Sequence, residues 1–173
     1  KTANDWVFFV DADEIVLPDL SREISDLFEG VPSCAGYFIK GHYMRDGHVM
    51  RFGIANNKLA LIDKTRMKFP EVDDLDCEAM GEIEGHYQPV LRIGHDDNKI
   101  GSLKHSLLHF AYDDSQSWER RHKRYAEWEV HMNSMHAWPE DPSPWRQWLK
   151  ETFRALPFRP QAAFIHSYIL KLG

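Results

Sequence analysis

The sequence predicts an α/β fold in which a sheet is followed by helices toward the carboxyl-terminal end. Three observations support this class. A continuous apolar run at residues 6–10 is typical of a strand buried on both faces, as in a parallel sheet. Shorter β-like segments follow it as far as residue 110, and from residue 117 onward apolar residues recur at helical spacing. The 173 residues, 43% of them hydrophobic, are enough to bury a core.

The first predicted strand leads directly into a cluster of carboxylates, Asp11, Asp13 and Glu14. Polar groups at the carboxyl end of a buried strand lie where open α/β sheets bind ligands. Asp11 and Asp13 are separated by one residue where the chain turns, so both can point into a cleft, and carboxylate oxygens suit Mg²⁺ or Mn²⁺. A solvated turn is the alternative interpretation, because Asp is a common turn residue.

The next elements are predicted from local spacing. Residues 18–28 predict a helix with one apolar stripe, and Gly30 suits the C′ position past its end. Residues 36–44 and 58–62 predict strands, and the turn signal at residues 45–48 predicts a hairpin that returns at 49–52.

The stretch from residue 68 to 101 breaks the regular pattern and is rich in acidic residues. A long irregular stretch in a compact domain is usually functional or mobile. Residues 102–110 return to an ordered pattern.

Three helices are predicted at the carboxyl-terminal end, at residues 117–132, 144–156 and 161–172. Residues 133–142 form a linker, and Ser143 is a good N-cap with Pro144 in the first helical position. The breaks between the last two helices are Pro157 and Pro160.

Charge and cysteine content exclude several classes of protein. The net charge of −6 and the pI near 5.9 argue against nucleic-acid binding by bulk electrostatics. Cys34 and Cys77 fit no CxxC pattern, so neither a zinc site nor a disulfide framework is indicated. Reduced thiols, the lack of a signal peptide and the lack of a membrane-spanning apolar run favour a cytoplasmic protein.

A downstream histidine offers a nitrogen ligand. His109 lies between apolar neighbours about a hundred residues after the Asp pair, and its imidazole could complete a metal shell. A hydrogen-bonded core histidine is the alternative, and the nearby His105 leaves open which histidine would serve.

The irregular stretch contains a loop that could supply a general base. Glu82 and Glu84 lie between two glycines, His86 follows the second of them, and either carboxylate could deprotonate an acceptor hydroxyl. An acidic surface loop is the alternative, and the pair Asp73 and Asp74 competes for the same role.

The predicted helix at residues 117–132 carries a basic group of side chains. Arg121, His122 and Arg124 could bind a phosphate or the anionic head group of a carrier lipid. A solvated basic face that pairs with the glutamates of the same helix is the alternative.

In their order along the chain, these motifs resemble the bacterial family 2 glycosyltransferases, in the branch that builds polysaccharides and lipopolysaccharide core. Residues 8–14 resemble the strand and DxD motif of that family, and residues 158–173 resemble its C-terminal helix. The segments between them that follow the expected order are residues 83–89, 108–110 and 121–129. The resemblance covers most of the chain.

The resemblance implies a GT-A-like, Rossmann-like sheet with C-terminal helices, a nucleotide-sugar donor, a saccharide or lipid-linked acceptor, and Mg²⁺ or Mn²⁺. It implies that Asp11 and Asp13 hold the metal and the diphosphate, and that His109 is a third ligand. Inverting members use an Asp or Glu base after the DxD motif. Glu84 is the first choice, with Glu82 and Asp74 as the other candidates.

The resemblance also implies a division of the chain. Residues 1–115 would be the C-terminal part of a GT-A catalytic domain, with the metal and acceptor side, and residues 116–173 a helical extension. The half of that family's domain that contacts the donor base and ribose is absent from the sequence, so we expect a fragment with weak or no activity alone. Peripheral association with the inner face of the membrane fits this branch, and core exposed by a truncated sheet would favour a homo-oligomer.

Two other functions fit parts of the sequence. Haloacid-dehalogenase-like phosphatases also place Asp-x-Asp after an apolar strand, with the first Asp as nucleophile, and Asp96 and Asp97 could serve as their late acidic motif. Against this, Glu14 stands where a glycine is usual in those enzymes. A non-catalytic module whose acidic cleft binds cations is the other alternative.

Overall fold

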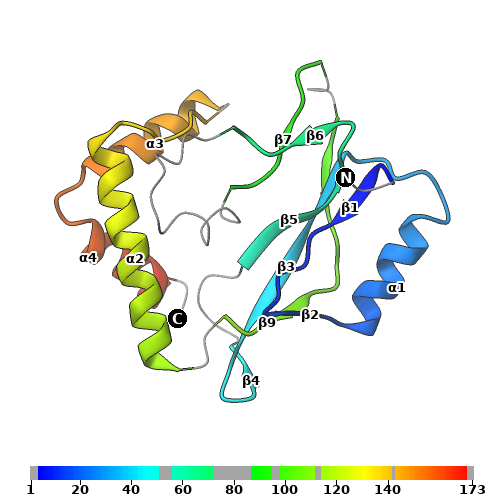
Figure 1. Cartoon of the computed structure of the whole chain (residues 1–173), viewed down its shortest axis with the longest axis horizontal. Helices are drawn as coiled ribbons and strands as arrows, with labels where there is room; N and C mark the ends of the chain where they lie inside the picture. Colours follow the sequence, from blue (N-terminus) through cyan, green and yellow to red (C-terminus); the bar gives the residue numbers. More distant parts are fainter. Residues whose placement is uncertain are drawn as a thin grey trace.

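The computed structural model describes residues 4–50, 56–71, 87–94, 98–111, 114–141 and 143–170. A mixed sheet occupies the centre of the described structure, with helix α1 on one side of it in Figure 1 and helices α2, α3 and α4 on the other. The predicted α/β class is therefore confirmed. None of the helices in these ranges is both long enough and apolar enough to cross a membrane.

The main sheet has the strand order β1-β5-β3-β9-β2, and β4 and β8 also pair with β3. The strands are β1 (Trp6–Phe8), β2 (Glu14–Val16), β3 (Gly36–Arg45), β4 (His48–Val49), β5 (Asn56–Asp63), β8 (Ile100–Ser102) and β9 (Leu107–His109). Only the pairs that β3 forms with β8 and with β9 are parallel among the pairings described. A second, small sheet consists of β6 (Met67–Lys68) and β7 (Val90–Leu91).

The prediction that the first strand is buried on both faces, as in a parallel sheet, is wrong. β1 is antiparallel to β5, has β5 as its sole partner among the described strands, and is only half-buried. The continuous buried run lies in β5 instead, at residues 59–63, because β5 is flanked by β1 and β3 and contributes to both apolar clusters of the core. An apolar run therefore identified a strand here but did not identify its neighbours.

Helix α1 (Pro18–Leu27) confirms the predicted helix and covers the larger core cluster. Leu20 is fully buried there with Ile39, Leu61 and Leu107. The end of the helix differs from the prediction, because Phe28 is the C-cap in a right-handed conformation and Gly30 is not left-handed.

The β3–β4 hairpin follows from its two turn residues. Asp46 and Gly47 have φ angles of 49° and 76°, in the left-handed region that glycine and Asp tolerate. Two consecutive left-handed residues match the right-handed twist of paired strands, which explains why this signal was reliable.

The helices at the carboxyl-terminal end are α2 (Ser115–Ser134), α3 (Pro144–Ala155) and α4 (Arg159–Phe164), which continues as the π-helix η3 (Ile165–Leu170). Helix α2 begins two residues earlier than predicted, because the Asp114 carboxylate accepts a 2.6 Å hydrogen bond from the Ser117 amide as N-cap. Ser143 and Pro144 begin α3 as expected. Pro160 lies in the first turn of the last helix, where no amide donor is needed, and not in the break before it as predicted.

Contacts around Trp138 hold these helices together. Its indole Nε1 donates to Asn133 Oδ1 at 2.8 Å, and the Arg154 guanidinium lies 4.2 Å from its ring centroid. Arg159 of α4 pairs with Glu129 of α2. Apolar side chains of the last helix are exposed, among them Phe164, Ile165, Tyr168 and Ile169. Whether residues 116–173 form a separate part of the protein stays a prediction.

A buried carboxylate fixes the turn after β5. Asp63 accepts hydrogen bonds from the Thr65 amide at 2.8 Å, the Thr65 hydroxyl at 2.6 Å and Arg66 Nε at 2.7 Å. Arg66 also donates to the Cys34 carbonyl at 2.8 Å, which ties this turn to the residues before β3. Burial raises the pKa of Asp63, but the hydrogen bonds from Thr65 and Arg66 outweigh it, so the pKa lies below its ordinary value.

We expect Asp63→Asn to lower the free energy of unfolding by about 2 kcal/mol at neutral pH, because it removes the negative charge of a buried acceptor that Thr65 and Arg66 donate to. A depressed folded-state pKa stabilises the protein above the unfolded pKa of about 3.9, and this contribution is lost as the pH falls through the folded value. The difference between wild type and variant should therefore shrink in acid. Urea unfolding at neutral and acid pH measures both. The control is Asp46→Asn, at a side chain 85% exposed, which should change stability by less than about 0.5 kcal/mol.

Candidate functional site

The Asp-x-Asp motif lies in the short connection between β1 and β2. The Glu14 amide donates to the Asp11 carbonyl at 3.0 Å, which closes a turn, and the Asp11 amide donates to Glu14 Oε2 at 2.8 Å. The Phe110 amide donates to the Asp13 carbonyl at 2.7 Å, which fastens the connection to the end of β9. The backbone of the motif is thus held at both ends by the sheet.

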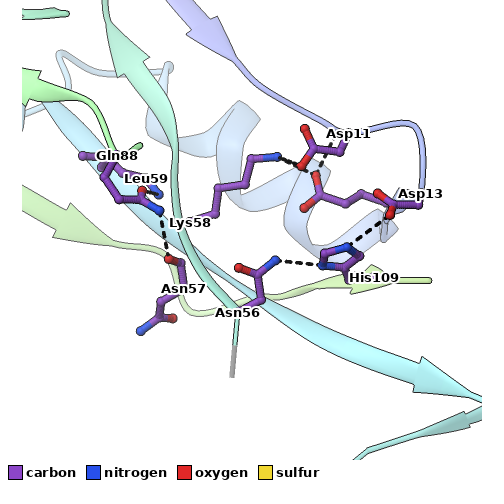
Figure 2. Close-up of polar contacts among 9 residues, drawn as sticks. Asp11, Asp13, Asn56, Asn57, Lys58, Leu59, Gln88 and His109 are labelled. Carbon is purple, nitrogen blue, oxygen red and sulfur yellow. Dashed lines mark hydrogen bonds and ion pairs between the residues drawn. The ribbon is translucent and has the colours of Figure 1, made fainter. Parts of the chain in front are cut away.

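The first of two polar groups at this site is an ion-pair triad. Lys58 Nζ lies 2.7 Å from Asp11 Oδ2 and 2.9 Å from Glu14 Oε2 (Figure 2). The Glu14 side chain is fully buried and that of Lys58 is 15% exposed, whereas that of Asp11 is 54% exposed. The buried partner of Lys58 is therefore Glu14, and Asp11 caps the pair from the solvent side.

The second polar group contains the other aspartate. His109 Nε2 lies 3.3 Å from Asp13 Oδ2, and Asn56 Nδ2 donates to His109 Nδ1 at 2.8 Å (Figure 2). The imidazole stacks on Tyr43, with ring centroids 5.1 Å apart and planes inclined by 28°. The stack follows from sheet register, since Tyr43 and His109 are opposite each other in the parallel pair of β3 and β9.

Strand β5 supplies a residue to each group. Asn56 and Lys58 are two positions apart on one strand, so their side chains emerge on the same face, toward the β1–β2 connection (Figure 2). Gln88 holds the same strand, because its Oε1 accepts from the Leu59 amide at 2.7 Å.

Tyr43 connects the site to the helices. Burial raises the pKa of its hydroxyl, and the nearby Tyr125 and Asp13 raise it further, so the hydroxyl is neutral across the ordinary working range. Tyr125 lies on α2, and Arg45 of β3 donates to Ser115 at the start of that helix at 3.4 Å. Helix α2 therefore approaches the site from the side of β3.

The side chains of the site carry the kinds of ligand atom that bind a divalent cation. Asp13 Oδ2 and His109 Nε2 face one another; carboxylate oxygens suit Mg²⁺ or Mn²⁺, and imidazole nitrogen is a common ligand of divalent metals. Glu14 Oε1 is buried and has no hydrogen-bond partner among the described residues, so an electropositive partner would stabilise it. The Asp11 carboxylate contacts Lys58, and its role as a metal ligand stays a prediction. Within the described ranges no three acidic, histidine or cysteine side chains form a ready-made metal cluster.

The other predicted residues are distributed differently. Asp74, Glu82 and Glu84 lie outside the described residues, so the choice of base stays a prediction. His105 contacts Glu23 and not the aspartates of the motif: its Nδ1 lies 2.9 Å from Glu23 Oε2.

The basic residues Arg121, His122 and Arg124 lie on α2. The His122 ring stacks on Trp118 with centroids 4.0 Å apart, and its Nδ1 is 2.8 Å from the Trp118 carbonyl. The indole therefore orients this histidine along the helix, and a phosphate contact by the three residues stays a prediction.

Sequence reasoning missed Asn56, Lys58 and Tyr43 as members of the site. Their partners are far away along the chain: Lys58 is 44 residues from Glu14, and Asn56 is 53 residues from His109. The only local signal for these residues was that polar residues stand at the beginning of the otherwise apolar strand predicted at 58–62.

Comparison of the chain with protein family models, with curated proteins and with solved structures returns no match. The function has to be argued from the residues of the site.

We expect Lys58→Met to lower the free energy of unfolding by about 3–5 kcal/mol, because it leaves the Glu14 carboxylate buried without its cation. Adding Glu14→Gln should restore most of this loss, since the remaining pair is uncharged. Chemical unfolding of both single variants and the double variant gives the coupling energy. Lys40→Met, at an exposed lysine on the neighbouring strand β3, is the matched control and should be nearly neutral. Additive effects of the two site substitutions would contradict the assignment.

Proposed function

We propose that this chain forms the metal and acceptor side of a GT-A-type glycosyltransferase. The enzyme would move a sugar from a nucleotide-sugar donor to a saccharide or lipid-linked acceptor, with inversion and with Mg²⁺ or Mn²⁺. The observation that carries the proposal is the contact of Asp13 with His109 at 3.3 Å, which joins the Asp-x-Asp motif to the one distant histidine that the family resemblance singles out.

The charges of the site support this reaction class. A divalent cation held by Asp13 and His109 would supply Lewis acidity to a departing nucleoside diphosphate. Lys58 neutralises Glu14 and part of the charge of Asp11, so the cluster is less repulsive to an anionic diphosphate than its carboxylates alone would be. Asp11 is the more exposed partner of Lys58 and can exchange that contact for a cation.

The acceptor hydroxyl needs a base, and the proposal assigns this role to Glu84, with Glu82 and Asp74 as alternatives. Each would remove the proton of the attacking hydroxyl as the new glycosidic bond forms. The carboxylates of residues 11–14 are not well placed for this purpose, because each of them already faces Lys58 or His109. A base from another segment is consistent with that arrangement.

Calorimetric titration with Mn²⁺, alone and with uridine or guanosine diphosphate, tests the proposal. We expect Mn²⁺ to bind, and its affinity to rise roughly fivefold or more in the presence of one nucleotide. Asp13→Asn should weaken Mn²⁺ binding by at least about tenfold. The control Asp19→Asn, at an exposed carboxylate on α1, should leave binding unchanged.

Other outcomes would favour the rival functions. Mn²⁺ affinity that is indifferent to nucleotide would favour a cation-binding module. Release of phosphate from a phosphomonoester, with a covalent phosphate trapped on Asp11, would favour a phosphatase.

A further inference from the structure

The His109 imidazole has a partner at each ring nitrogen. Nε2 faces Asp13 Oδ2 at 3.3 Å and Nδ1 accepts from Asn56 Nδ2 at 2.8 Å. The ring is 13% exposed and stacks on Tyr43, so its plane is held between neighbouring groups. The features that remain free to change are the position of the ring proton and the orientation of the Asn56 amide.

A neutral imidazole has one donor and one acceptor nitrogen. Because the amide nitrogen of Asn56 can only donate, Nδ1 must be the acceptor, and the proton is on Nε2, pointing at the Asp13 carboxylate. In that tautomer Nε2 has no lone pair for a cation. A half-turn of the amide would place its Oδ1 against the ring, Nδ1 would then carry the proton, and Nε2 would present a lone pair toward Asp13.

We propose that Asn56 is a positioning residue that selects the tautomer of His109, and that its amide orientation decides whether Nε2 donates to Asp13 or binds a divalent cation beside it. The inference rests on the metal site of the proposed function. Histidine ligands usually donate their second ring N–H to an oxygen, and the half-turn of the amide would bring Asn56 Oδ1 to the place beside Nδ1 that Nδ2 now occupies.

The neighbouring strand leaves room for this amide. Asn56 is opposite Gly41 in the register of β3 and β5. A Cβ at Gly41 would lie 3.3 Å from Asn56 Cβ and 3.4 Å from its Nδ2, tight enough to displace the side chain by a few tenths of an ångström. The added Cβ would also lie 3.3 Å from Cδ1 of the buried Leu107, so Gly41→Ala disturbs the amide together with a core residue on the same strand as His109.

The first readout is the tautomer itself in the metal-free protein. Long-range ¹H–¹⁵N spectra at alkaline pH, assigned with His109→Gln, should show the proton on Nε2 in the wild type. Asn56→Asp can only accept from Nδ1, so the proton should move to Nδ1. Asn56→Leu and Gly41→Ala should give mixed tautomers. Asn57→Asp adds the same charge one residue further along, on an exposed side chain that Figure 2 shows pointing away from His109, and should leave the tautomer unchanged.

The second readout is Mn²⁺ affinity. Asn56→Leu should weaken Mn²⁺ binding by about 10–100-fold, as loss of a supporting hydrogen bond does. Asn56→Asp should bind Mn²⁺ more tightly than Asn57→Asp, because only the former frees Nε2.

An unchanged tautomer in Asn56→Asp would overturn the inference whatever the metal does. A changed tautomer with Mn²⁺ affinity equal to that of Asn57→Asp would overturn the coupling to the cation. If the tautomers respond as expected but the protein binds no Mn²⁺, the proposed function is contradicted. The control of the His109 tautomer by Asn56 would still stand.

Discussion

The site depends on the burial of one charge, the carboxylate of Glu14. A buried carboxylate requires a cation and hydrogen-bond donors, and its Oε2 obtains them from Lys58 Nζ and from the Asp11 amide. The contact with Lys58 joins the β1–β2 connection to β5, a strand that is not adjacent to β2 in the sheet. Satisfying Glu14 therefore fixes the loop that carries Asp11 and Asp13. Since Asp13 is in turn bonded through its carbonyl to Phe110, the loop has little freedom left.

This constraint divides the Asp-x-Asp motif into two roles. Asp11 turns toward Lys58 and joins the group that stabilises the fold, whereas Asp13 turns toward His109 and joins the group with ligand chemistry. Two carboxylates one residue apart do not have to share a target, and the contact each makes depends on which strand lies beside it. Sequence spacing alone treated them as one pair.

The features predicted correctly from the sequence are those that local physics determines. The stripe that ends at Phe28, the Asp46-Gly47 turn, and the Ser143-Pro144 helix start each depend on residues within a few positions of one another. The errors concern burial and pairing over long separations. The run at residues 6–10 was assigned to a parallel, doubly covered strand, but strand neighbours depend on which distant segments pair, and that role belongs to β5. Lys58 and Asn56 were missed for the same reason.

Strand β5 therefore positions side chains of the site as well as of the core. Its buried residues 59–63 fix its position between β1 and β3, and its first three residues place Asn56 and Lys58 on one face. The amide contacts His109 and the ammonium contacts Glu14 and Asp11, yet both side chains come from one strand, so a shift of the strand would move both at once. The Asn56 amide can present either its nitrogen or its oxygen to His109, whereas the ion pair of Glu14 with Lys58 ties the strand to the β1–β2 connection. The stable ion pair thus provides the fixed frame in which a reversible amide can determine what His109 offers to a ligand.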